Sequence, residues 1–293
     1  MSSKYYKAYK LDEALMKLKE NPENSNLIAG GTDIVIEIKN KKIKPDFIID
    51  ISDLKELKDI SIEEDNIELG SMVTFTQLEN EDFPKNLKAL SEAAHSVGSP
   101  QIRNKGTIGG NICNGSPAAD LVPPLLALNS IVTLESTRGK REIALEDVFL
   151  DKGKTVLEID EILTKIRFKN LKENEFLSFS KLGLRNALAI SRICTSVYVK
   201  VQDKKIENIR IANGALGRYG IREKNIEDKL IGMPLNKKTI EYGKEEINKE
   251  IKERLKGRSS MEFKSEAIKG TLHKSLFNAL NYFLDRKVGV ING

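Results

Sequence analysis

Two glycine-rich segments constrain this chain more than any other feature of its sequence. Residues 30–33 read Gly-Gly-Thr-Asp, and residues 106–111 read Gly-Thr-Ile-Gly-Gly-Asn. Glycine lacks a Cβ, so it lets another backbone or a ligand approach closely and can adopt positive φ angles. Successive N–H groups in such a turn, next to the start of a helix, form a concavity that favours anions. Either segment alone could be an ordinary tight turn, but together they indicate a site for a pyrophosphate.

These segments do not follow the common nucleotide-binding motifs. The chain contains neither the Gly-x-Gly-x-x-Gly spacing of a Rossmann fold nor the Gly-x-x-x-x-Gly-Lys-[Ser/Thr] sequence of a P-loop. Their absence disfavours a doubly wound nucleotide fold and a P-loop ATPase. A dinucleotide bound by this chain must therefore be held in another manner.

Hydrophobic periodicity predicts that the first segment, about residues 1–55, forms a small α/β unit. Thr32 is a common N-cap residue, and Ile34, Val35 and Ile38 would form the apolar face of the helix that follows it. The predicted elements are a helix over 11–18, a strand over 26–29, a helix over 33–40 and a strand over 45–51.

A second segment, about 56–172, mixes short strands with helices, and a third, 173–293, has strands followed by helices, an order typical of a separate α+β domain. The second is predicted to contain two β runs within 60–70, a helix over 87–97, a helix over 121–129 and a hairpin over 131–145. The third is predicted to contain a hairpin over 195–216, with Val197, Val199 and Val201 on one face and Ile209 and Ile211 in the returning strand. A charged helix at 244–256 and a last helix are predicted to follow. The core stripe of the last helix would consist of Leu272, Leu276, Leu280 and Phe283.

Composition and charge narrow the classes of function. The 293 residues are enough for about two domains. The net charge is +5, and its basic side chains are interleaved with acidic ones, so no nucleic-acid-binding face stands out. No apolar run approaches the ~20 residues of a membrane span, and the N-terminus lacks the apolar core of a secretory signal. We therefore expect a cytoplasmic protein that binds neither nucleic acid nor membrane.

The cysteines and histidines argue against a metal site. Cys113 and Cys194 form no Cys-x-x-Cys motif, whereas an iron–sulfur cluster needs about four thiolates and structural zinc needs a similar ligand set. His95 and His273 are far apart in sequence, and two ordinary helix residues are a simpler interpretation than a metal pair. We therefore expect a reduced, metal-free chain.

Five segments spread over nearly the whole chain carry a resemblance to a known family. They are LIAGGTDIVIEIKN (27–40), QIRNKGTIGGNICNGSPAADLVPPLLAL (101–128), DEILTKIRF (160–168), FSKLGLRNALAIS (179–191) and IRIANGALGRYGIREKNIEDKLIGMPL (209–235). Together they resemble the FAD-binding (medium) subunit of the molybdenum hydroxylases, the group that contains xanthine dehydrogenase and carbon monoxide dehydrogenase. The run GGNICNG is more similar to the flavin subunits of xanthine dehydrogenase than to those of carbon monoxide dehydrogenase.

The resemblance implies an α+β fold in two domains. Residues 1–172 would form an FAD-binding domain of the para-cresol methylhydroxylase/vanillyl-alcohol oxidase type, in two α/β subdomains of about 1–55 and 56–172. Residues 173–293 would form a C-terminal α+β domain of the carbon monoxide dehydrogenase flavoprotein type.

The resemblance also implies which residues bind FAD. The two glycine-rich segments would hold its diphosphate through backbone amides, a lysine would lie near the flavin ring, and a backbone contact would follow the glutamate of the DEIL motif. The residues that match these positions are Leu27, Ile28, Ala29, Gly30, Gly31, Thr32, Asp33, Ile34, Thr107, Ile108, Gly109, Gly110, Asn111, Asp120, Leu163 and Lys181.

Simpler roles stay open for several of these residues. Asp120 could be only the N-cap of the helix that follows it. Lys181 could be a surface residue on a strand, and the side chain of Leu163 suits a hydrophobic core. Thr32 could cap its helix and contact a phosphate at the same time.

The function implied by the resemblance is electron transfer in a larger oxidoreductase. An iron–sulfur small subunit, reduced by a molybdopterin-binding large subunit, would pass electrons through FAD to NAD or another acceptor. The chain lacks cysteines for its own cluster, so those centres must belong to partners. The alternatives are a self-contained flavin-dependent oxidoreductase of the same fold and a non-catalytic scaffold. A bulky residue at Gly109 or Gly110 would occupy the cofactor's space or force strain of about 1–3 kcal/mol, so we expect such variants to fold but purify colourless.

Overall fold

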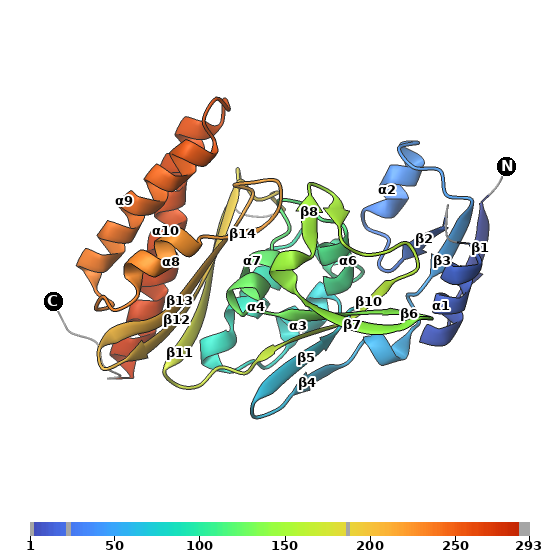
Figure 1. Ribbon diagram of the computed structural model, residues 1–293, viewed down its shortest axis with the longest axis horizontal. Helices are drawn as coiled ribbons and strands as arrows, with labels where there is room; N and C mark the ends of the chain where they lie inside the picture. The colour runs from blue at the N-terminus through green and yellow to red at the C-terminus, as the bar shows by residue number, and fades with distance from the viewer. Residues whose placement is uncertain (1–2, 22–24, 186–187, 287–293) are drawn as a thin grey trace.

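The computed structural model describes residues 3–21, 25–185 and 188–286. Their strands form a three-stranded, a five-stranded and a four-stranded sheet, together with a two-stranded ribbon. Figure 1 shows the sheets following one another along the long axis, with the N-terminal sheet at one end and the C-terminal helices at the other. Within the described ranges, no helix is both long and apolar enough to cross a membrane.

The N-terminal sheet is parallel and has the order β1-β3-β2. α1 (Leu11–Glu20) buries Ala14, Leu15 and Leu18, which pack in one cluster with Ile49 of the central strand. The predicted helix over 11–18 and the predicted strands of this unit are therefore confirmed. These predicted strands are β2 (Ser25–Ile28) and β3 (Phe47–Asp50), whereas β1 (Lys4–Lys7) was not predicted.

The helix that follows the first glycine-rich segment differs from its prediction. α2 (Ile34–Lys39) confirms the predicted helix in shorter form, but none of its residues is buried, so its apolar face of Ile34, Val35 and Ile38 does not join the core. Val35 and Ile36 are 51% and 55% exposed. The reason is the position of α2, which lies at the rim of a cavity lined in part by Ile34 and Ile36 rather than flat on the sheet.

The central sheet is antiparallel, and its order is β4-β5-β10-β6-β7. The two predicted β runs and the predicted hairpin are confirmed as β4 with β5 and as β6 with β7. Chain topology inserts β10 between these pairs, which local periodicity did not predict. The strands are β4 (Ile60–Ile62), β5 (Asn66–Gly70), β6 (Ile131–Ser136), β7 (Gly139–Ala144) and β10 (Ile162–Lys169).

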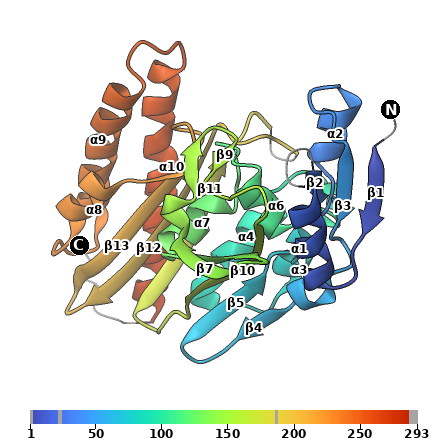
Figure 2. The same cartoon turned by 45° about the vertical axis from the view of Figure 1, so that its right-hand side comes forward.

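Short helices pack between the central sheet and the C-terminal sheet (Figure 2). The predicted helices over 87–97 and 121–129 are confirmed in shorter form, as α4 and α7. α7 contains Pro123 and Pro124 in its first turn, where a missing N–H costs no helical hydrogen bond. The helices are α3 (Phe75–Asn80), α4 (Ala89–His95), α5 (Pro100–Arg103), α6 (Ile108–Cys113) and α7 (Val122–Ala127); 3-10 turns cover Lys55–Leu57, Lys85–Leu87 and Leu145–Asp147, and the ribbon pairs β8 (Phe149–Asp151) with β9 (Lys154–Thr155).

The C-terminal sheet is antiparallel in the order β11-β12-β13-β14, and long helices cover its outer face (Figure 1). Val197, Val199 and Val201 alternate along β12 and pack with these helices, as the hairpin prediction required. The elements are β11 (Glu175–Leu182), β12 (Ile193–Gln202), β13 (Lys205–Gly214), β14 (Ile221–Arg222), α8 (Lys224–Leu230), α9 (Lys237–Arg254) and α10 (Met261–Asp285).

The inner face of this sheet shares a hydrophobic core with the central part of the chain. Leu177, Phe179, Cys194 and Tyr198 belong to the same buried cluster as the central sheet and the short helices. The core therefore runs across the predicted domain boundary at 172/173. The predicted stripe of the last helix, Leu272, Leu276, Leu280 and Phe283, packs on the opposite face.

Candidate functional site

A cavity of about 700 Å³ lies where the two glycine-rich segments meet. This volume lies within the range of cofactor pockets. Its walls come from the loop between β2 and α2, from α2, from the region between α4 and α7, and from residues 188–190. The sequence-predicted residues that line it are Leu27, Ala29, Gly30, Gly31, Thr32, Asp33, Ile34, Thr107, Gly110, Asn111 and Asp120.

Two of the glycines let protein segments pack against each other. A Cβ on Gly30 would lie 1.7 Å from the carbonyl oxygen of Lys105, which precedes the second glycine-rich segment. A Cβ on Gly109 would lie 2.8 Å from the carbonyl oxygen of Ser71. Real side chains do not tolerate such distances to backbone. Of the two effects expected of a side chain at Gly109, the structure therefore favours strain over filling of the cofactor's space, because Ser71 occupies the position of the added Cβ.

Gly110 has a different environment. An added Cβ there would meet only the Thr107 hydroxyl oxygen, at 3.0 Å, and Gly110 itself lines the cavity. A side chain at this position would consequently extend toward the cavity. Gly31 is distinct again, because its φ of +73° is one that residues with a Cβ rarely adopt.

The backbone amides of the two segments are used differently. In the second segment, the N–H groups of Ile108 and Gly109 donate to the carbonyls of Val73 and Ser71, at 2.9 and 2.8 Å. Those of Gly110 and Asn111 donate to the Thr107 hydroxyl and carbonyl, at 3.1 and 2.9 Å. The expected cradle of free amides is therefore not present over these residues, since tertiary partners and a helix cap already occupy them.

The first segment does have free amides. Within the part of the chain that the structure describes, no protein group accepts a hydrogen bond from the N–H groups of residues 29–33. Thr32 is not the N-cap of α2; Asp33 takes that position without a side-chain capping bond, so the capping prediction is wrong. Buried or half-buried N–H groups without protein acceptors bind water or a ligand. This run is the best candidate for an anion-binding surface.

Asn111 adds an unsatisfied acceptor to the opposite wall. Its Oδ1 atom is buried and, among the described residues, has no hydrogen-bond partner. Asn111 lines the cavity beside Gly110. An unpaired buried carbonyl oxygen costs about 1–3 kcal/mol, and a donor on a bound ligand would remove that cost.

Asp120 and Lys181 form a buried ion pair at one end of the cavity. Lys181 Nζ lies 2.6 Å from Asp120 Oδ2 and also donates to the Ser96 carbonyl at 2.8 Å. The Ser191 hydroxyl donates to the other carboxylate oxygen, Oδ1. Burial raises the pKa of the Asp120 carboxyl, and the Lys181 ammonium and the Ser191 hydroxyl oppose that rise.

This geometry decides two of the open alternatives. Leu121 occupies the N-cap of α7, so Asp120 is not merely the cap of that helix. The Lys181 side chain is 13% exposed and paired, so it is not an ordinary surface residue of a strand.

A second cavity of about 480 Å³ adjoins the first, and Gly98, Leu188 and Ala189 line both. Positively charged or protonatable side chains gather in it, whereas no carboxylate among the described residues lines it. These side chains are His95, Arg103, Lys181 and Arg185.

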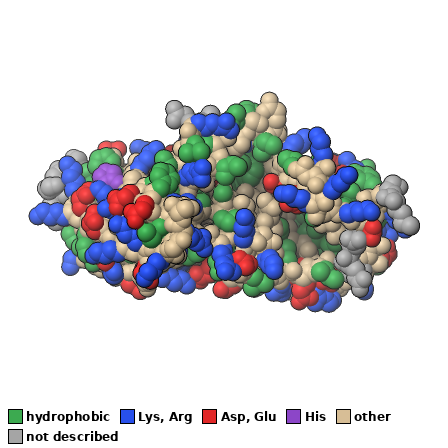
Figure 3. All heavy atoms as spheres, turned by 90° about the horizontal axis from the view of Figure 1, so that it is seen from above, with side chains coloured by type: hydrophobic (Ala, Val, Ile, Leu, Met, Phe, Trp, Pro, Cys, Tyr) green, Lys and Arg blue, Asp and Glu red, His purple; other side chains and the backbone are tan. Residues whose placement is uncertain are grey.

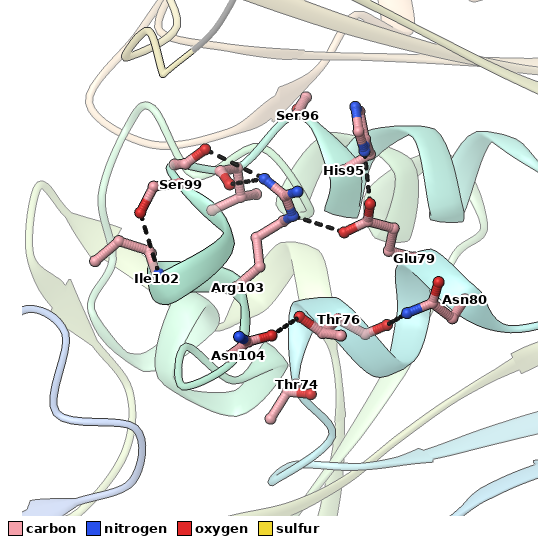
Figure 4. Close-up of polar contacts among 12 residues, drawn as sticks. Thr74, Thr76, Glu79, Asn80, His95, Ser96, Ser99, Ile102, Arg103 and Asn104 are labelled. Carbon is pink, nitrogen blue, oxygen red and sulfur yellow. Dashed lines mark hydrogen bonds and ion pairs between the residues drawn. The ribbon is translucent and has the colours of Figure 1, made fainter.

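Arg103 binds the turn that follows α4, and Gly98 of this turn lines both cavities (Figure 4). Its Nε donates to Glu79 at 2.6 Å, and its Nη1 donates to the carbonyls of Val97 and Gly98 at 3.3 Å. His95 contacts the other carboxylate oxygen of Glu79 at 2.6 Å. These contacts from His95 and Arg103 lower the pKa of Glu79.

Several predicted residues lie behind the cavity rather than on it. Ile28, Ile108, Gly109 and Leu163 are not among the lining residues, and Ile108 and Leu163 are buried in hydrophobic core. The backbone role of Leu163 stays a prediction. Sequence reasoning missed Asn114, Ser116 and the segment Leu188–Ile190, although all of them line the cavity. The signal that the sequence offered for that last segment is its apolar character. In the structure, Ile190 of this segment is 82% exposed.

Thiol, metal and surface chemistry add little at this site. Cys113 lines the cavity, but burial raises the pKa of its thiol to about 12. Within residues 3–21, 25–185 and 188–286, no cluster of histidine, cysteine and acidic side chains is arranged to hold a metal ion. Basic and acidic side chains are intermixed over the face in Figure 3.

Known proteins resemble this chain over most of its length. A family model described as the FAD binding domain in molybdopterin dehydrogenase matches residues 1–168, and one for the CO dehydrogenase flavoprotein C-terminal domain matches residues 178–279. The nicotinate dehydrogenase FAD-subunit of Eubacterium barkeri is 40% identical, covering 87% of this chain and 88% of the relative. The xanthine dehydrogenase FAD-binding subunit of Escherichia coli O157:H7 is 34% identical, covering 94% and 95%.

A solved structure has the same fold. Carbon monoxide dehydrogenase from Hydrogenophaga pseudoflava contains a chain that superposes with a TM-score of 0.87 at 23% identity, covering 96% of this chain and 98% of that one. The mixed α and β architecture is therefore that of the flavoprotein subunits. The chain belongs to the FAD-binding subunits of the molybdenum hydroxylase-type dehydrogenases, a family of oxidoreductases, and its cofactor is FAD.

Proposed function

We propose that FAD occupies the 700 Å³ cavity and that the free amides of residues 29–33 bind its diphosphate. These N–H groups lack protein acceptors among the described residues, and this single observation carries the assignment. Two phosphate charges would satisfy several such donors at once. Asn111 would accept a hydrogen bond through its unpaired Oδ1, and Gly110 would leave room beside it.

We propose that Asp120 and Lys181 serve the flavin ring. The Lys181 ammonium has three N–H groups, of which Asp120 and the Ser96 carbonyl accept two. No third acceptor is found among the residues described. Asp120 lines the 700 Å³ cavity and Lys181 lines the cavity that adjoins it, so the ammonium lies where the two cavities meet. The remaining N–H would donate to an electron-rich atom of the cofactor. Asp120 would fix the ammonium in place and limit its positive charge.

We further propose that this chain works within a larger complex. When bound, FAD supplies the redox chemistry. Electrons would pass from a molybdopterin-binding large subunit to an iron–sulfur small subunit, then to FAD, and from FAD to NAD or another acceptor. The names of two relatives, a nicotinate dehydrogenase FAD-subunit and a carbon monoxide dehydrogenase medium chain, support an assembly of this kind. We propose a cytoplasmic location for it.

The acceptor proposal is supported by the second cavity. Arg185 lines this cavity and has no carboxylate partner among the described residues, so it would attract a ligand with negative charge, such as the diphosphate of NAD. The cavity adjoins the proposed flavin site through Gly98, so a bound acceptor would lie beside the cofactor. The residues of this chain would bind and orient the acceptor but would not carry electrons themselves.

We also propose that the domains divide near 172/173. The two family models end at residue 168 and begin at residue 178, which agrees with that boundary. Residues of the two parts nevertheless share a core, so we expect them to unfold as one cooperative unit.

The direct test is mild purification of the chain with its partner subunits, followed by visible spectroscopy and NADH titration. We expect one FAD per chain and reduction of the flavin by NADH. A chain that binds no added FAD would overturn the cofactor site. Stoichiometric reduction of the isolated chain by an organic substrate would favour the self-contained oxidoreductase instead.

A further inference from the structure

Ser191 lies at the junction between the cavity wall and the C-terminal sheet. It directly follows the segment Leu188–Ile190, which lines the cavity, and precedes β12. Its side chain is buried, and its hydroxyl donates to Asp120 Oδ1. No motif prediction singled out this residue.

The contacts of Asp120 show what this hydroxyl does. Lys181 donates to Oδ2, and Ser191 donates to Oδ1. Asp120 is 6% exposed, so water offers little replacement for a lost donor. A carboxylate with one free oxygen could rotate about its Cα–Cβ bond away from Lys181. The hydroxyl on Oδ1 therefore holds the other oxygen on the ammonium.

We propose that Ser191 is a positioning residue for the flavin site: it holds Asp120 in the orientation that directs Lys181 toward the cofactor. This inference rests on the proposed role of Lys181. The hydroxyl does not need to touch the cofactor, because it acts through two charged side chains. Loss of a hydrogen bond to a charged group changes the binding constant that depends on this bond by about tenfold.

The experiment compares FAD binding and the flavin absorption spectrum in the full-length chain and its variants. Ser191→Ala is expected to raise the FAD dissociation constant about tenfold and to shift the long-wavelength flavin band. Ser191→Thr keeps a hydroxyl and is expected to restore both. Ser178→Ala is the matched control, because Ser178 is equally buried on β11 but donates to the Val197 carbonyl at 3.2 Å.

Lys181→Met provides the second arm of the test. If Ser191 acts through Lys181, then Ser191→Ala in the Lys181→Met background should cause less than a twofold further change in FAD affinity. An unchanged spectrum and dissociation constant in Ser191→Ala, with a loss of thermal stability equal to that of Ser178→Ala, would reduce Ser191 to a structural residue. Failure of the wild-type chain to bind FAD would instead refute the proposed function.

Discussion

Substituting Gly30 and Gly110 separately distinguishes the two roles of the glycine-rich segments. In Gly30→Ala the new Cβ would lie 1.7 Å from the Lys105 carbonyl oxygen, so the two segments must move apart. Overpacking of this kind costs about 1–3 kcal/mol. For a cooperative unit of this size, each kcal/mol lowers Tm by about 2–4 °C. We therefore expect Gly30→Ala to lower Tm by about 2–12 °C and to weaken FAD binding indirectly.

Gly110→Ala should behave in the opposite way. Its Cβ meets only the Thr107 hydroxyl oxygen, at 3.0 Å, and that side chain can shift. Alanine is also favoured over glycine in a helix by up to about 1 kcal/mol. We expect Tm to be unchanged or raised, while the methyl group in the cavity raises the FAD dissociation constant at least about tenfold.

The assays are thermal unfolding of the FAD-free chain and fluorescence titration with FAD. Gly270→Ala on α10 is a suitable control, because a Cβ there meets no neighbouring atom. The reasoning fails if Gly110→Ala binds FAD as tightly as the wild type. It also fails if Gly30→Ala keeps the wild-type Tm, because the contact with Lys105 would then not exist in solution.

Three further predictions concern charged groups. The Glu223 side chain is fully buried against Arg254, 2.6 Å away, so Arg254→Met should lower the free energy of unfolding by about 3–5 kcal/mol in urea titrations; a loss below about 1 kcal/mol would contradict this. Arg141 lowers the pKa of Glu161, so their ion pair stabilises the fold fully above about pH 4.3 and progressively less as the pH falls through the lowered pKa. Glu161→Gln should therefore lose less stability on acidification than the wild type, and an equal dependence of stability on pH in the two proteins would contradict this prediction. Asp120→Asn keeps the shape of the side chain but removes the negative charge beside Lys181, so FAD affinity should fall. Asn114→Ala, at the cavity wall, serves as the comparison variant, and equal FAD affinities of Asp120→Asn and the wild type would exclude the proposed role of Asp120.

Local patterns predicted the elements that bury a regular face. Leu272, Leu276 and Leu280 repeat at helical spacing, and Val197 and Val199 alternate along a strand, so the period itself specifies the element and its inner side. The same pattern in α2 leads to no core, because none of its residues is buried and two of them, Ile34 and Ile36, line a cavity. Periodicity cannot distinguish these two destinations.

The site depends on contacts between distant parts of the sequence. The amides of Ile108 and Gly109 bond to Val73 and Ser71, and no feature of the glycine motif reveals those partners. Likewise, Ser191 and Asp120 come together only when the C-terminal sheet packs on the central helices. Family resemblance identified Asp120 and Lys181 as site residues, but only the fold supplies the third member of their network.

The close packing of Gly30 on Lys105 has a consequence for the order of events in biogenesis. Neither wall of the cavity is complete until the N-terminal parallel unit has docked on the chain segment before α6. A nascent chain that has released only its first strands would offer amides without an enclosing pocket. The yellow colour of bound FAD would then mark mature molecules. The rate at which this colour appears would report the rate at which the N-terminal unit docks.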